Sequence, residues 1–132
     1  MIRILKITTN KIVIEKDIKG DLESLQSEVG GLISRVPYFD ELADMYIDMY
    51  ADNEGLLKAD PITTFIKAED NKIVNMLVGN LIFTGYNDDG ETLGLTDEQL
   101  AFILAHLEMV EVKGRNTKTD EDVSFKCFTF KF

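Results

Sequence analysis

The sequence predicts an α+β domain with a mainly antiparallel sheet and two to three short helices. Three observations indicate this class: short β-rich runs bounded by turn residues, short segments with helix-capping residues, and no internal repeat or linker between them. With 132 residues, of which 45% are hydrophobic, the chain can bury one sizeable core and is too short to divide comfortably into two. We therefore expect a single domain over residues 1–132.

The first thirty residues predict a β-hairpin followed by a helix. Apolar and polar side chains alternate within residues 2–18 on both sides of a polar turn at residues 9–11, as they do in two half-buried strands. Residues 22–29 then carry apolar side chains at helical spacing. Asp21 is a good N-cap for this helix, and Gly30 can take the left-handed conformation that ends it.

The next segment predicts extended structure. Residues 32–39 return to a strand-like pattern that Pro37 interrupts. Residues 44–51 alternate strictly between apolar and polar side chains, which is typical of a strand, and the polar turn at residues 52–55 closes this run.

The third quarter of the chain predicts a short helix and then a central strand. Asp60 is a good N-cap and Pro61 suits the first helical position, with Ile62, Phe65 and Ile66 on the apolar side of the helix. Residues 75–86 are the most hydrophobic stretch, and they predict a strand buried on both faces at the centre of the sheet. Asp89 and Gly90 supply the turn after it.

The end of the chain predicts the clearest helix and a second hairpin. Thr96 and Gln99 form a capping box at the start of this helix, and its expected inward residues are Leu100, Ile103, Leu104 and Leu107. The β-rich runs within residues 108–132 flank a polar turn, so we expect a C-terminal β-hairpin appended to the rest of the domain.

The strand predicted over residues 44–51 separates two kinds of side chain. Met45, Ile47, Met49 and Ala51 would enter the core, whereas Asp44, Tyr46, Asp48 and Tyr50 would form an acidic and aromatic stripe. One interpretation is structural: a helix covers the stripe, and the tyrosine hydroxyls find partners inside the fold. The other is functional: the tyrosines anchor a basic protein, and carboxylates repeating every ~6.6 Å along a strand approximate the spacing of backbone phosphates.

The net charge excludes several classes of function. The chain has 14 lysines and arginines against 24 aspartates and glutamates, which gives a formal charge of −10. All of the excess negative charge lies in residues 21–110, which contain 18 acidic and four basic residues. Such a protein repels nucleic acid and anionic membrane surfaces, so we expect direct binding to neither. The sequence has no apolar run of membrane-spanning length and one cysteine, which favours a cytoplasmic location.

No catalytic or cofactor motif stands out in the sequence. His106 is the only histidine and Cys127 the only cysteine, so a metal site of nitrogen and sulfur ligands would lack members. No serine lies in a nucleophile elbow, and the acidic turns lack the spacing of a calcium loop. The glycines fit neither a phosphate loop nor a dinucleotide fingerprint. We therefore expect no enzymatic activity, no metal and no cofactor.

Three stretches resemble a family of domains of unknown function, DUF3846. They are LESLQSEVGGLISRV, IDMYADNEGLLKADPIT and MLVGNLIFTGYNDDGETLGLTDEQ, and the resemblance covers about residues 1–107. The sequence departs from the family at KADPIT, where relatives more often place an asparagine in a Leu-Pro-x-Asn setting. The family has no agreed activity or catalytic residues. The resemblance implies a setting in phages, plasmids and other mobile elements, whose accessory proteins often counter host defence.

These observations lead to two expectations of function. The first is a non-enzymatic accessory protein that inhibits a basic, nucleic-acid-handling host protein, as an anti-CRISPR protein does. Its expected binding surface consists of Asp44, Tyr46, Asp48, Tyr50, Asp52 and Glu54. The alternative is a binding module that sequesters a small molecule or nucleotide beside Gly30, Gly31, Asn53 and Gly55. A homo-oligomer is compatible with both.

Overall fold

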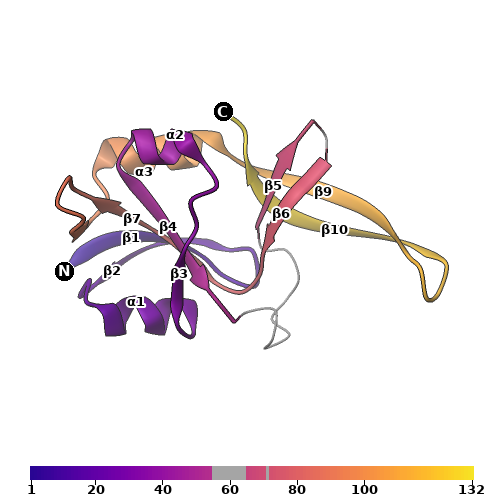
Figure 1. Ribbon diagram of the computed structural model, residues 1–132, viewed down its shortest axis with the longest axis horizontal. Helices are drawn as coiled ribbons and strands as arrows, with labels where there is room; N and C mark the ends of the chain where they lie inside the picture. Colours follow the sequence, from indigo (N-terminus) through magenta and orange to yellow (C-terminus); the bar gives the residue numbers. More distant parts are fainter. Residues whose placement is uncertain (55–64, 71) are drawn as a thin grey trace.

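The fold consists of two β-sheets and three helices in the described part of the chain (Figure 1). The structure is a computed structural model that describes residues 1–54, 65–70 and 72–132. Helix α1 (Leu22–Val29) covers one side of the first sheet, and α2 (Asp40–Asp44) and α3 (Asp97–His106) lie together on the other side. This arrangement confirms the predicted α+β class and its mainly antiparallel pairing.

The first sheet has the strand order β2-β1-β7-β4-β3, with β8 added to β7, and all its pairings are antiparallel. Its strands are β1 (Ile2–Ile7), β2 (Val13–Ile18), β3 (Ile33–Arg35), β4 (Ile47–Asp52), β7 (Leu81–Tyr86) and β8 (Thr92–Leu93). The predicted N-terminal hairpin is confirmed by the pairing of β1 with β2. Strand β7 lies at the centre, and its residues from Leu81 to Gly85 are buried, as predicted for this hydrophobic stretch.

The second sheet has the order β6-β5-β10-β9. Its strands are β5 (Phe65–Glu69), β6 (Lys72–Leu77), β9 (Leu107–Asn116) and β10 (Glu121–Phe130). Strands β9 and β10 pair antiparallel over their full length, which is the predicted C-terminal hairpin. Its distal half extends away from the rest of the molecule (Figure 1). Among the described strands, only β10 and β5 pair in parallel, at Phe128 and Phe65.

Helices α1 and α3 begin where their capping residues predict. The backbone N–H of Ser24 donates to the Asp21 carboxylate at 2.8 Å, and α1 ends at Gly30, whose φ of +88° is left-handed. Thr96 and Gln99 form the complete capping box of α3. Local sequence signals therefore determine both helices.

The predicted strand over residues 44–51 is wrong at its N-terminal end. Asp44 belongs to α2, Tyr46 lies in a turn, and β4 begins at Ile47. Two causes favour the short helix: acidic residues in its first turn complement the helix dipole, and Leu42 is buried in the core. From Ile47 onward the apolar side chains are buried as predicted, but the polar residues Asp48 and Asp52 are buried as well.

Three further predictions need correction. Phe65 and Ile66 are not helical but begin β5, because pairing with β6 and β10 buries both side chains; Asp60, Pro61 and Ile62 lie outside the described residues. The predicted strand over residues 75–86 divides into β6 and β7, and Gly79 between them has a φ of +77°. Leu104 of α3 does not face inward: 49% of it is exposed, because the core contact of this helix centres on Ile103.

The core has two parts, one on each face of the first sheet. The larger part contains the aromatic residues Phe39, Phe65, Phe83 and Phe130. The smaller part lies under α1 and consists of Ile4, Ile18, Leu25, Val29 and Ile82. Cys127 is also buried, and burial raises the pKa of its thiol.

A buried carboxylate connects α1 to the N-terminal hairpin. Glu28 is 8% exposed, and its two oxygens accept hydrogen bonds from Lys6 at 2.8 Å and Lys16 at 2.6 Å. Burial alone would raise the pKa of Glu28, but the hydrogen bonds and charges of the two ammonium groups outweigh burial and lower it. Ionised Glu28 therefore stabilises the folded state.

We expect Glu28→Gln to lower the free energy of unfolding at pH 7 by about 2 kcal/mol, because partly buried Lys6 loses its charged partner. The stabilisation by ionised Glu28 is complete above its unfolded-state pKa and is lost as the pH falls through the lower folded-state pKa. Urea titrations between pH 3 and pH 7 measure this. The variant should lose less stability on acidification than the wild type, whereas exposed Glu23→Gln should follow the wild type. Equal acid sensitivity of both variants would contradict the role of Glu28.

Candidate partner-binding site

An open pocket of about 660 Å³ lies between the end of α2, strand β4 and the turn after β7. Its lining residues are Arg35, Ala43, Asp44, Tyr46, Asp48, Tyr50, Tyr86, Asn87, Asp88 and Gly90. We call it the tyrosine–aspartate pocket. All four residues of the predicted acidic and aromatic stripe line it, although only Asp48 and Tyr50 lie on the strand.

Tyr46 has an unusual backbone conformation at the rim of this pocket. Its φ is +58°, in the left-handed region, which costs a bulky residue about 1 kcal/mol or more. Three hydrogen bonds hold this conformation. The N–H of Tyr46 donates to the Ala43 carbonyl at 3.0 Å, and the Tyr46 carbonyl accepts from the Tyr86 N–H at 3.1 Å and from the Gln99 side chain at 3.0 Å. The surrounding structure therefore fixes the direction in which the Tyr46 ring points.

The Tyr46 side chain is 45% exposed and is held by the turn after β7. Its hydroxyl donates to the Asp88 carboxylate at 2.9 Å, and its ring centroid lies 5.3 Å from that of Tyr86. The hydrogen bond to Asp88 and the negative charge of that carboxylate raise the pKa of Tyr46. The Tyr86 hydroxyl in turn donates to the Ala43 carbonyl at 3.1 Å. The two rings thus form a supported aromatic surface.

The inner part of the pocket contains an ion pair. Arg35 donates to buried Asp48 at 3.0 Å, and the Tyr50 hydroxyl donates to the other Asp48 oxygen at 3.1 Å. Burial and the Asp48 charge raise the pKa of Tyr50. The Arg35 guanidinium also lies 5.8 Å from the centroid of the Tyr86 ring. Because Arg35 already balances its charge, Asp48 offers less unbalanced negative charge than the exposed carboxylates do.

The six predicted partner-binding residues separate into two groups. Asp44, Tyr46, Asp48 and Tyr50 line the pocket, whereas Asp52 and Glu54 lie at the other end of β4. Asp52 is buried, and one of its oxygens accepts a hydrogen bond from the Glu54 N–H at 2.9 Å. The six residues therefore do not form one exposed surface, since Asp48 and Asp52 are both buried.

Sequence reasoning missed Arg35, Tyr86, Asn87 and Asp88. The Asn-Asp-Asp-Gly segment was interpretable as a turn, and it is one: its Asn87 side chain accepts from the N–H groups of Asp89 and Glu91. The antiparallel register of β4 against β7 places this turn beside Tyr46. The sequence does contain one signal for this placement. The strand before the turn is predicted to lie at the centre of the sheet, where it has neighbours on both sides.

Two glycines of the alternative ligand site, Gly30 and Gly31, have structural roles. Gly30 ends α1, and the Gly31 N–H donates to the Gln26 carbonyl at 3.1 Å. The Asn53 N–H donates to the Leu32 carbonyl at 3.0 Å, so the two segments do lie side by side. Gly55 lies outside the described residues. A second hollow of about 410 Å³ includes Asn53 together with Tyr38, Asp52 and Met76.

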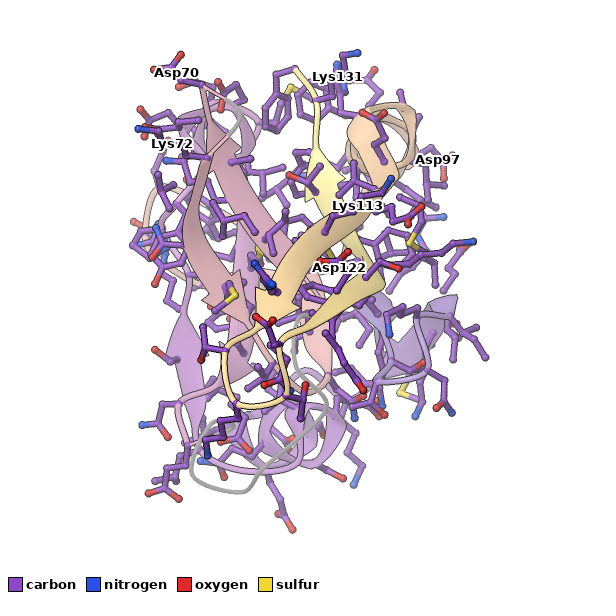
Figure 2. All side chains as sticks on the ribbon, turned by 90° about the vertical axis from the view of Figure 1, so that its right-hand side faces the viewer. Asp70, Lys72, Asp97, Lys113, Asp122 and Lys131 are labelled. Carbon is purple, nitrogen blue, oxygen red and sulfur yellow. The ribbon has the colours of Figure 1, made fainter. Side chains whose placement is uncertain are left out.

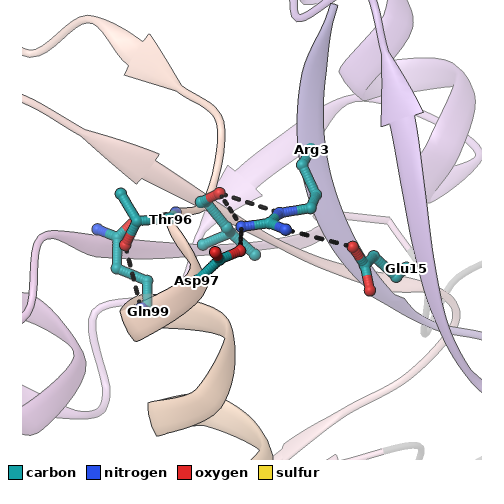
Figure 3. A network of polar contacts seen from close by, with 6 residues as sticks. Arg3, Glu15, Thr96, Asp97 and Gln99 are labelled. Carbon is teal, nitrogen blue, oxygen red and sulfur yellow. Dashed lines mark hydrogen bonds and ion pairs between the residues drawn. The ribbon is translucent and has the colours of Figure 1, made fainter.

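Exposed carboxylates lie in three segments that contribute residues to the tyrosine–aspartate pocket or contact it through Tyr46. They are Asp44 of α2, Asp88, Asp89 and Glu91 of the turn after β7, and Asp97 and Glu98 of the first turn of α3. The Gln99 side chain joins α3 to the Met45 and Tyr46 carbonyls, both at 3.0 Å. Figure 3 shows the start of this helix, where Arg3 contacts Asp97 at 2.8 Å and also contacts Glu15 at 3.5 Å. Only part of the acidic charge is therefore balanced within the chain.

Comparison with known families gives one match. A family model described as a domain of unknown function, DUF3846, matches residues 2–108. The chain belongs to the DUF3846 family. This confirms the resemblance found in the sequence. No curated protein and no solved structure matches the chain.

The tyrosine–aspartate pocket lies within the DUF3846 match, whereas most of β9 and all of β10 lie beyond it. In the described ranges of this DUF3846 chain, no group of three or more histidine, cysteine, aspartate or glutamate side chains is placed to hold a metal ion. His106 lies at the end of α3, where its Nδ1 is 2.8 Å from the Phe102 carbonyl oxygen and its ring contacts Phe102. No described helix is long and apolar enough to cross a membrane.

Proposed function

We propose that this DUF3846 protein is a non-enzymatic accessory protein of a phage or other mobile element that binds and inhibits a host protein. The partner is a basic, nucleic-acid-handling protein such as a CRISPR effector or another defence nuclease. The binding surface is the tyrosine–aspartate pocket with the exposed carboxylates of α2, the turn after β7 and α3. The carboxylates occupy the groove that the partner uses for nucleic acid.

The proposal rests mainly on the conformation and exposure of Tyr46. It is an exposed aromatic residue in a strained backbone conformation, held by contacts from three separate segments. Strain of this kind persists where the surrounding structure enforces it, and it is concentrated at functional sites. A rigid tyrosine with a polar tip is also a common anchor of protein interfaces, because it loses little conformational entropy on binding.

The distribution of charge supports a basic partner. The formal charge is −10, and the exposed carboxylates of Asp44 and Asp88 line the pocket, with Asp89 and Glu91 in the same turn as Asp88. Carboxylates arranged in this way steer a positively charged protein toward the surface and repel nucleic acid. Binding through them should weaken as the salt concentration rises. Nucleic acid and this protein should therefore compete for the same partner.

A comparison of two charge variants tests the proposal. Asp44→Lys with Asp88→Lys reverses two charges at the pocket, and Glu23→Lys with Glu54→Lys reverses two exposed charges away from it. Each substitution adds two charges, so both variants carry a formal charge of −6. Each protein is immobilised and used to capture proteins from a bacterial host lysate, which are identified by mass spectrometry. We expect a basic nucleic-acid-binding protein to be retained by the wild type and the control variant but not by the pocket variant.

A purified retained protein then allows a direct measurement. Its binding to labelled DNA or RNA should be inhibited by the wild type and by the control variant, and at least tenfold less by the pocket variant. Equal inhibition by both variants would contradict the proposed surface. A thermal shift with nucleotides, combined with no specific protein partner, would favour the alternative function as a ligand-binding module.

A further inference from the structure

Strand β9 is the longest edge strand among the described residues. In the described residues, β9 pairs only with β10, so one side of its ten residues has no strand beside it. The other edge strands are shorter, with six residues in β2 and β6 and three in β3. A bulge in the β5–β6 pairing also makes the β6 edge irregular. Unpaired edge strands readily add a strand from another chain.

The distal part of the hairpin has little support from the rest of the fold. We call residues 110–126 the arm. All residues from 113 to 124 are exposed, and the backbone pairing of β10 with β5 lies at Phe128, beyond the arm. Figure 2 views the molecule toward the end of the arm, with Lys113 and Asp122 labelled on its two strands. A two-stranded ribbon is marginally stable in water, so a third strand on its free edge would stabilise it.

The charge pattern of β9 is complementary to itself. In an antiparallel pair of two β9 strands related by a two-fold axis at Val112, Glu111 lies opposite the partner's Lys113, and Lys113 lies opposite the partner's Glu111. A two-fold axis at Glu111 or at Lys113 would instead place like charges opposite each other. No ion pair of the described residues uses Glu111 or Lys113 within the chain.

The same register extends an apolar strip across both copies. Val112 lies opposite Phe125 within the hairpin, so both side chains are on one face of the arm. Val112 and the partner's Val112 would lie opposite each other on that face. Phe125 and the partner's Phe125 would flank them, which covers side chains that are half-exposed in one copy.

We propose that two copies of this chain associate through their β9 strands, in antiparallel pairing centred on Val112. The two four-stranded sheets then form one continuous sheet across the two-fold axis. The unpaired N–H and C=O groups of one β9 edge form hydrogen bonds with those of the other. The two Glu111–Lys113 contacts set the register. This interface is separate from the tyrosine–aspartate pocket, so both surfaces operate in the same molecule.

Sedimentation velocity over a concentration series tests the dimer in the full-length protein. We expect the wild type to shift from monomer to dimer with increasing concentration. Lys113→Glu should weaken the dimer at least tenfold, because it places two pairs of glutamates opposite each other. Lys118→Glu makes the same charge change in the turn of the hairpin and should leave the dimer intact.

A mixing experiment separates pairing from folding defects. Glu111→Lys alone should also weaken the dimer, but Lys126 faces this position within the hairpin, so the arm itself is perturbed. Mixing the Glu111→Lys and Lys113→Glu proteins should form a heterodimer, since lysines of one copy then face glutamates of the other. A wild type that remains monomeric at all soluble concentrations would overturn the proposal. Self-association that Lys113→Glu leaves unchanged would overturn it as well.

Discussion

Replacing Phe130 with alanine should lower the free energy of unfolding by about 4 kcal/mol. The Phe130 side chain is buried, and its ring centroid lies 5.1 Å from those of Phe39 and Phe65 and 5.8 Å from that of Phe83. It thereby connects β10 to β5, to β7 and to the residue before α2. Removing the ring leaves a cavity among three other aromatic residues, which cannot fill it without moving strands of both sheets.

Thermal and urea unfolding of purified Phe130→Ala measure this loss, and a melting temperature more than about 10 °C below that of the wild type is expected. Phe132→Ala is the matched control. Phe132 lies two residues further along and also stacks on Phe130, but it is 46% exposed, so its loss should cost about 1 kcal/mol or less. Similar losses for the two variants would show that Phe130 does not have the central role assigned to it.

Replacing Tyr46 with glycine should weaken partner binding while changing the stability of the fold little. Glycine adopts a φ of +58° without strain, so the relief of strain offsets the lost contacts with Tyr86 and Asp88. We expect the free energy of unfolding to change by no more than about 1 kcal/mol. The affinity for the proposed basic partner should fall by about 2 kcal/mol, roughly thirtyfold, chiefly through faster dissociation.

Two variants make this result interpretable. Tyr46→Phe keeps the ring and loses only the hydrogen bond to Asp88, so it should retain most of the affinity. Tyr46→Ala loses the ring and keeps a Cβ in the left-handed conformation, so it should be less stable than Tyr46→Gly. Calorimetric titration with the captured partner and urea unfolding measure both quantities. Undiminished affinity of folded Tyr46→Gly would rule out Tyr46 as the anchor.

Elements with strong local signals could be predicted from the sequence. Asp21 and Gly30 bound α1, and the capping box of Thr96 and Gln99 starts α3, because each of these residues satisfies backbone groups of its own helix end. The two hairpins follow from alternating runs on either side of a polar turn. The class of the fold follows from the order of these elements.

Elements that depend on distant contacts could not be predicted in this way. Phe65 and Ile66 fit the apolar side of a helix, but they form a strand because β10 supplies its neighbour from more than 60 residues away along the chain. The tyrosine–aspartate pocket also depends on contacts between segments that are distant in the sequence. Asp88 contacts Tyr46 because β4 and β7 pair in a register that no local pattern specifies, so the predicted stripe is only part of the candidate site.

Gln99 performs two tasks with one amide group. Its oxygen accepts the Thr96 N–H at 2.9 Å and so completes the start of α3 (Figure 3), while its nitrogen donates to the carbonyls of Met45 and Tyr46. The first turn of α3 and the strained turn at Tyr46 therefore lose a shared hydrogen-bonding group whenever either one opens. Local unfolding at one of them removes support from the other, so we expect the helix start and the turn at Tyr46 to belong to one cooperative unit. A partner that binds Tyr46 should therefore also stabilise the first turn of α3, although it need not contact that helix.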